Sequence, residues 1–208
     1  MVVIGKKYPY AFVHVPKTGG NSVYAFLCAV EGRRNLIPTG NEPLRKMRQI
    51  VSRGAHSTLR PNENPSFCFA FFRDPVDRWL SYYRYLTKIR GNPRNLEAGP
   101  WILDRLRGIP YKGGSTDSRV PKFVWETKPQ EYFVREGFHI YKASNAGRRR
   151  FKDDFADAFG LDDTPALPHL NKTRGADATI SHEVVEAIYE YEPLATQFFQ
   201  SPDLSMQV

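Results

Sequence analysis

The sequence predicts an α/β fold, a three-layer sandwich with a central parallel sheet, and two observations lead to this prediction. Two continuous apolar runs, residues 11–15 and 66–72, each stop at a polar turn and then continue with helical periodicity. Strands that are buried on both faces and feed helices are typical of parallel sheets covered by helices. The 208 residues, 41% of them hydrophobic, are enough for one substantial core. We therefore expect a single domain over residues 1–208.

The first of these strand–loop–helix units contains a loop suited to an anion. Apolar residues recur at helical spacing from Val23 to Val30, so the helix begins directly after the loop. Gly19 and Gly20 let the backbone approach a ligand closely, and the first amides of the helix point toward it. Lys17 adds a full positive charge. The unit predicts a phosphate or sulfate site.

The second unit places another cation at the end of a strand. Arg73 follows the apolar run, Asp74 is a suitable N-cap, and Pro75 fits the first helical position. If the two strands are close in the sheet, Lys17 and Arg73 open onto the same crevice, because ligands of such folds bind beyond the carboxyl ends of the strands. A ligand with two separate anionic groups would span them. A helix-flanking ion pair of Arg73 with Asp74 or Asp77 is the alternative role.

The remainder of the chain predicts fewer elements. A short helix is expected around residues 101–106, a third strand over 138–141, and a last helix from the Ser181 cap to Pro193. Residues 88–150, rich in glycine, proline and basic side chains in their first part, are the expected acceptor-specificity region, because surface loops usually determine specificity.

Composition limits the partners and the compartment. A net charge of +8 and a pI near 9.5 suit nucleic acid, an acidic glycan, an anionic lipid or a nucleotide. No apolar run approaches the roughly 18 residues of a transmembrane helix, and no signal peptide is visible. Cys28 and Cys68 are expected to be buried reduced thiols. These features favour a cytoplasmic protein without a membrane segment.

Two other chemistries fit the residues less well. In a kinase or NTPase loop the lysine follows the glycines and a later carboxylate binds magnesium, whereas Lys17 precedes them and no strand ends in such a carboxylate. A zinc helix would need a second histidine where Glu186 follows His182. We therefore expect no metal.

Two segments resemble sulfotransferase motifs. Residues 15–22, Val-Pro-Lys-Thr-Gly-Gly-Asn-Ser, resemble the 5′-phosphosulfate loop of that family, and Arg73–Tyr83 resembles its 3′-phosphate motif, in the same order and spacing. The pattern is most similar to carbohydrate sulfotransferases of the heparan 2-O and related bacterial type. His56 falls where that branch keeps its base, and His169–Thr173 resembles its C-terminal nucleotide-contacting segment.

The resemblance implies a P-loop-like fold and a donor, 3′-phosphoadenosine 5′-phosphosulfate (PAPS), which leaves as 3′,5′-ADP. It implies that Lys17 stabilises the departing oxygen and that His56 accepts the proton of the acceptor hydroxyl. It further assigns the 3′-phosphate to Arg73 and Ser81. The other residues that it assigns to the nucleotide are Thr18, Gly19, Gly20, Asn21, Ser22, Lys172 and Thr173.

The expected acceptor is a carbohydrate hydroxyl, and a small metabolite, a lipid or a peptide tyrosine remain alternatives. Outside this class of enzyme, a basic nucleic-acid-binding module and a nucleotide kinase are the competing interpretations, although we expect no nucleic-acid partner. A structural role is expected for His14 and Arg78. The basic cluster Arg148–Arg150 is expected to be solvated surface or a dock for an acidic glycan.

Overall fold

The computed structural model describes residues 2–32, 36–39, 59, 65–90, 96–108, 127–168 and 178–208. The strands are β1 (Val2–Gly5), β2 (Tyr10–Val13), β3 (Leu36–Thr39), β4 (Phe67–Phe72), β5 (Phe138–Lys142) and β6 (Ser205–Gln207). The helices are α1 (Gly20–Glu31), α2 (Pro75–Arg90), α3 (Ala98–Leu106), the 3₁₀ helix η3 (Gln130–Phe133), α4 (Asn145–Phe159), α5 (His182–Tyr191) and α6 (Pro193–Gln200).

The described strands form one six-stranded sheet in the order β3-β1-β2-β4-β5-β6. Only its centre is parallel: β2 pairs with β4, and β4 with β5. The other three strands, β1, β3 and β6, pair antiparallel with their neighbours. The predicted α/β class is confirmed, whereas the expectation of a parallel sheet is wrong at both sides. A short turn joins β1 to β2, and a turn of that length permits only antiparallel pairing.

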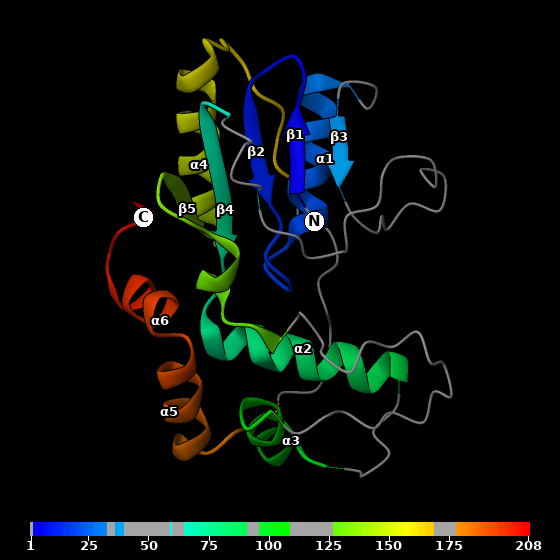
Figure 1. Cartoon of the computed structure of the whole chain (residues 1–208), viewed down its shortest axis with the longest axis vertical. Helices are drawn as coiled ribbons and strands as arrows, with labels where there is room; N and C mark the ends of the chain where they lie inside the picture. The colour runs from blue at the N-terminus through cyan, green and yellow to red at the C-terminus, as the bar shows by residue number, and fades with distance from the viewer. Residues whose placement is uncertain are drawn as a thin grey trace.

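Helices α1 and α4 lie behind the sheet in Figure 1, and η3 and α6 contribute side chains to its other face. On one face, side chains of α1 and α4 pack on the strands in a largely aromatic cluster that includes Phe26, Phe69 and Phe151. On the other face, η3 and α6 contribute Phe133 and Phe198 to a second cluster. Three layers result, with the central strands β2 and β4 almost fully buried.

A second group of helices lies beyond the carboxyl ends of the central strands. Helix α2 crosses beneath the end at which β4 finishes, with α3 and α5 packed below it (Figure 1). Trp79, Trp101 and Ile188 are among the buried residues that join these three helices. The arrangement brings α2 next to the loop that follows β2.

Several elements differ from the predicted ones. The strand β3 is not among the predicted elements, nor is the helix α4, which contains the basic cluster Arg148–Arg150. The last predicted helix, from the Ser181 cap to Pro193, is confirmed as α5, and a further helix, α6, begins at Pro193. Cys28 and Cys68 are free thiols as expected, but each is half-buried rather than buried.

Candidate functional site

The loop between β2 and α1 is tightly wound. Lys17 has a φ of 68° and Gly19 a φ of 91°, so two left-handed residues lie within three positions. The Thr18 hydroxyl donates to the Val15 carbonyl oxygen at 2.9 Å, and the Ser22 amide donates to the Gly19 carbonyl oxygen at 2.9 Å. A left-handed lysine is strained by about 1–2 kcal/mol, and such strain is concentrated at functional sites. Consecutive turns of this kind create concave sites for anions.

The start of α1 is shaped by a close contact with His14. A Cβ built on Gly20 would lie 2.1 Å from His14 Cδ2, so only glycine fits there. His14 is half-buried directly after β2, and its ring stacks near Phe12 with centroids 6.2 Å apart. A packing role therefore fits His14, in line with the expectation from the sequence.

Lys17 is directed toward helix α2. Its ammonium nitrogen lies 4.0 Å from the centroid of the Tyr85 ring, a cation–π contact. Tyr85 is 39% exposed, so one face of this aromatic ring is available at the edge of the site. The contact places the positive charge of Lys17 on the side of the loop that faces the second predicted motif.

The second motif begins α2 as predicted. The Asp77 amide donates to Asp74 Oδ1 at 2.9 Å, which makes Asp74 an N-cap, and Pro75 is the first residue of the helix. Burial raises the pKa of the Asp74 carboxyl. Arg73 lies 3.6 Å from Asp77 with 34% of its side chain exposed. A surface pair of this kind contributes about 0–1 kcal/mol, so Arg73 stays available to a ligand.

The two loops are neighbours because β2 and β4 are neighbours. Val13 pairs with Ala70 in the parallel register, so the residues that follow β2 and β4 emerge at the same edge of the sheet. Lys17 and Arg73, which are 56 residues apart in sequence, therefore follow adjacent strand ends. The sequence predicts a shared crevice for Lys17 and Arg73 if their two strands are close in the sheet, and β2 and β4 meet this condition.

Ser81 lies on the face of α2 that meets the glycine loop. Arg78 touches the loop at the Pro16 carbonyl oxygen and Tyr85 touches it at Lys17. Ser81 is three residues after Arg78 and four residues before Tyr85, which is the spacing of one helix face. Its side chain is buried.

A buried ion pair joins the loop to the rest of the site. Arg78 Nη1 contacts Glu192 Oε1, and the two side chains are 2% and 0% exposed. The same guanidinium donates from Nε to the Pro16 carbonyl oxygen at 3.1 Å and from Nη2 to the Lys128 carbonyl oxygen at 2.8 Å. Arg78 thus has the structural role expected from the sequence, and it holds the residue next to Lys17.

Gln130 extends this network to Arg73. Its side chain accepts from the Arg73 amide and donates to the Arg73 carbonyl oxygen, each at 2.8 Å. It also donates to Glu192 Oε2 at 2.8 Å, while the Trp79 indole donates to Glu192 Oε1 at 2.8 Å. Glu192 and Gln130 are both fully buried. One polar network therefore fixes the backbone of both predicted anion-binding loops, and nothing in the sequence pattern indicated it.

The family of the chain follows from a comparison with known families. A model described as the sulfotransferase family matches residues 1–123, more than half of the chain, and both loops lie inside the match. The chain belongs to the sulfotransferase family. No curated protein and no solved structure gives a significant match to this sulfotransferase.

Three of the predicted site residues cannot be placed in the sulfotransferase structure. His56, Lys172 and Thr173 lie outside the described residues. His56 is nevertheless inside the matched region, between the two loops in sequence. Lys17, Arg73 and Ser81 and the residues 18–22 are the predicted site residues that the structure brings to one edge of the sheet.

Two further features bear on the other sequence predictions. Among the described residues, no group of three or more possible metal ligands occurs, and His182 and Glu186 form an exposed pair 3.6 Å apart. The described helices of the sulfotransferase also include none long and apolar enough to cross a bilayer.

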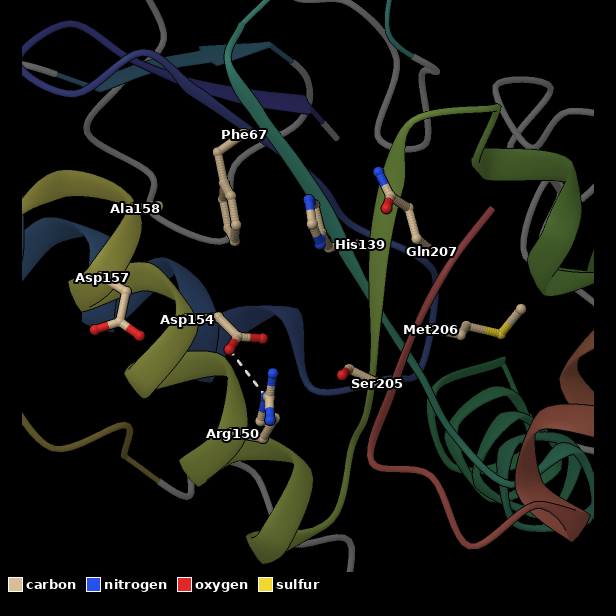
Figure 2. A pocket seen from close by; sticks show the side chains of 9 residues that line it. All are labelled: Phe67, His139, Arg150, Asp154, Asp157, Ala158, Ser205, Met206 and Gln207. Carbon is tan, nitrogen blue, oxygen red and sulfur yellow. Dashed lines mark ion pairs between the residues drawn. The ribbon is translucent and has the colours of Figure 1, made fainter.

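A pocket of about 570 Å³ lies on another part of the sulfotransferase, between α4, β5 and β6. Figure 2 shows Phe67 and His139 on one side and the ion pair of Arg150 with Asp154 on the other. Phe67 begins β4, and His139 lies near the start of β5, so the pocket is toward the amino ends of these strands. It is therefore separate from the loops that follow the carboxyl ends.

Proposed function

We propose that this sulfotransferase transfers the sulfuryl group of PAPS to a hydroxyl group, with a carbohydrate as the acceptor. One observation supports the proposal above the others: Lys17 and Arg73 follow neighbouring parallel strands at one edge of the sheet. PAPS has two separate anionic ends, the 5′-phosphosulfate and the 3′-phosphate. Two cationic loops at adjacent strand ends match such a ligand.

The residues at these loops fit the two ends. The glycine loop has left-handed turns at Lys17 and Gly19 and no Cβ at Gly20, which suits close contact between backbone amides and a phosphosulfate. The Thr18 hydroxyl already donates to Val15, so its contribution would come from the amide. Arg73 and the buried Ser81 would bind the 3′-phosphate through charge-assisted hydrogen bonds.

In the donor, a bridging oxygen joins the sulfuryl group to the 5′-phosphate. This oxygen leaves readily when the negative charge that develops on it is stabilised. In an in-line displacement the acceptor oxygen forms a bond to sulfur while the bond from sulfur to the bridging oxygen breaks, and the electron pair stays on the 5′-phosphate. Lys17 would donate to that oxygen as negative charge develops there. His56 would accept the proton of the acceptor hydroxyl, since a neutral imidazole is a base near neutral pH.

Titration calorimetry with 3′,5′-ADP tests the nucleotide assignment. We expect wild-type protein to bind it and Arg73→Ala to bind about 10-fold to 100-fold more weakly, because a charge-assisted hydrogen bond is worth about 1.5–3 kcal/mol. Arg107→Ala, which removes an exposed arginine after α3, is the matched control and should bind as the wild type does. Absence of binding by the wild type would refute the proposal.

The roles in catalysis and the acceptor need separate measurements. His56→Ala should keep its affinity for 3′,5′-ADP and lose about 100-fold or more in turnover, the usual contribution of a general base. An acceptor screen with labelled PAPS, read by mass spectrometry, should label a sugar hydroxyl. Labelling of a lipid, a small metabolite or a tyrosine instead would replace the carbohydrate assignment and leave the reaction class intact.

A further inference from the structure

The three consecutive arginines at the start of α4 have different surroundings. Arg150 pairs with Asp154 at 2.9 Å on the side of the pocket in Figure 2, and Arg149 is exposed. Arg148 is half-buried instead, and its Nη2 lies 3.3 Å from a Cβ built on Gly19. The cluster is therefore divided, and its first member faces the glycine loop.

The position of α4 explains why Arg148 reaches this loop. A Cβ on Gly147 would lie 2.2 Å from the Lys142 carbonyl oxygen, so the first turn of α4 rests directly on the end of β5. Phe72 pairs with Lys142, and the Ala143 amide donates to the Phe72 carbonyl oxygen at 2.7 Å. Since Arg73 follows Phe72, the end of β5 brings Arg148 to the same edge of the sheet as Arg73.

The positive charges of Arg73 and Arg148 influence each other. Burial, and then the positive charge of Arg73, lowers the pKa of the Arg148 guanidinium. In the part of the chain that the structure describes, no carboxylate pairs with Arg148, and the Asp77 partner of Arg73 is 63% exposed. Two close cations repel each other when no anion lies between them. A dianion bound by both would reverse the sign of this interaction, and guanidinium groups match phosphate oxygens in geometry.

We propose that Arg148 binds the 3′-phosphate of the donor nucleotide together with Arg73, an inference that rests on the proposed function. The 3′-phosphate is favoured over the 5′ end because the first turn of α4 rests on the end of β5, which is hydrogen-bonded to the residue before Arg73, whereas Lys17 is directed to Tyr85 on α2. Gly19 leaves room for the Arg148 guanidinium because it has no side chain, and a Cβ at this position would be in tight contact with that group.

A comparison of two nucleotides tests this assignment. Calorimetry would measure the affinities of wild type, Arg148→Ala and Arg149→Ala for 3′,5′-ADP and for 5′-AMP, which lacks the 3′-phosphate. We expect Arg148→Ala to bind 3′,5′-ADP about 10-fold to 100-fold more weakly and 5′-AMP as the wild type does. Arg149→Ala, which alters the exposed neighbour on the same helical turn, should leave both affinities unchanged.

Thermal unfolding without nucleotide separates binding from folding. Removing one member of a like-charged pair should leave the Tm of Arg148→Ala equal to or above that of the wild type, and a lower Tm would indicate a structural role and overturn the assignment. Equal affinity of Arg148→Ala and wild type for 3′,5′-ADP would overturn it too, as would a similar loss for both nucleotides. Absence of any binding by the wild type would instead refute the proposed function itself.

Discussion

Arg78 and Glu192 form a buried ion pair across 114 residues of sequence, and this pair connects the two predicted anion-binding loops. Arg78 reaches the first loop at Pro16, and Glu192 reaches Arg73 of the second loop through Gln130. The loops that contain Lys17 and Arg73, which would bind a ligand, are therefore supported by Arg78 and Glu192, which are buried away from it. Such support orients groups in advance, which lowers the cost of organising them when a ligand binds.

Removing one partner of this pair should destabilise the protein strongly. Glu192→Ala leaves the Arg78 charge buried without compensation, which costs about 3–5 kcal/mol. For a chain of this size we expect the Tm to fall by roughly 6–20 °C. Glu186→Ala, at an exposed glutamate on the preceding helix, is the control and should change the Tm little. Equal Tm values for the two variants would show that the pair is not structural.

Much of the central fold could be predicted from the sequence. The strands β2 and β4 belong to the two apolar runs, β5 is rich in aromatic and β-branched residues, and α2 begins with an aspartate cap and a proline, so local patterns specify these elements. The strands β1, β3 and β6 have three or four residues each. Strands that short have no distinctive period, and the pairing of β1, β3 and β6 depends on tertiary contacts. Strand β2 is as short, but the glycine loop and helical pattern that follow it mark it in the sequence. For this reason the antiparallel sides of the sheet were not predictable.

The same distinction applies to the candidate site. Lys17, Arg73 and Ser81 could be predicted because each belongs to a motif of neighbouring residues. The buried ion pair of Glu192 and the proposed role of Arg148 depend on how α6 and α4 pack against other elements, far from either loop in sequence. In the sequence, Glu192 is one of several acidic residues near the last helices, and Arg148 is one of three consecutive arginines. Their burial, rather than their type, distinguishes them.

The contact between Lys17 and Tyr85 should control the accessibility of the lysine. Tyr85→Phe keeps the ring beneath the ammonium group, whereas Tyr85→Leu removes a cation–π contact worth about 0.5–1 kcal/mol. We expect acetic anhydride to modify Lys17 about two- to fivefold faster in Tyr85→Leu than in wild type, read by mass spectrometry. Tyr85→Phe should react as the wild type does. A faster reaction of both variants would assign the effect to the hydroxyl group rather than to the ring.

Two helical glycines should respond oppositely to alanine. At Gly147 the new Cβ would lie 2.2 Å from a backbone oxygen, so Gly147→Ala forces α4 away from β5 and should destabilise by about 1–3 kcal/mol. At Gly99 in α3 the nearest atom is a Val184 methyl at 3.4 Å, an ordinary contact. Gly99→Ala should therefore be neutral or stabilising by up to about 1 kcal/mol, from helix propensity. Denaturant unfolding measures both. Equal stability of Gly147→Ala and wild type would contradict the close contact between α4 and β5.

Alkaline pH should destabilise the fold through Tyr141. Burial first, and then the charge of Asp154, raises the pKa of the Tyr141 phenol, whose hydroxyl donates to Asp154 at 2.9 Å. The unfolded chain would ionise this tyrosine near its ordinary pKa of about 10, while the folded chain keeps it protonated. The stabilisation is therefore complete below about pH 10 and is lost as the pH rises further.

We expect the free energy of unfolding to fall less steeply above about pH 10 in Tyr141→Phe than in wild type. Tyr132→Phe, at a ring that is 43% exposed, should give a curve parallel to the wild type. Parallel curves for wild type and Tyr141→Phe would show that another group causes the alkaline loss.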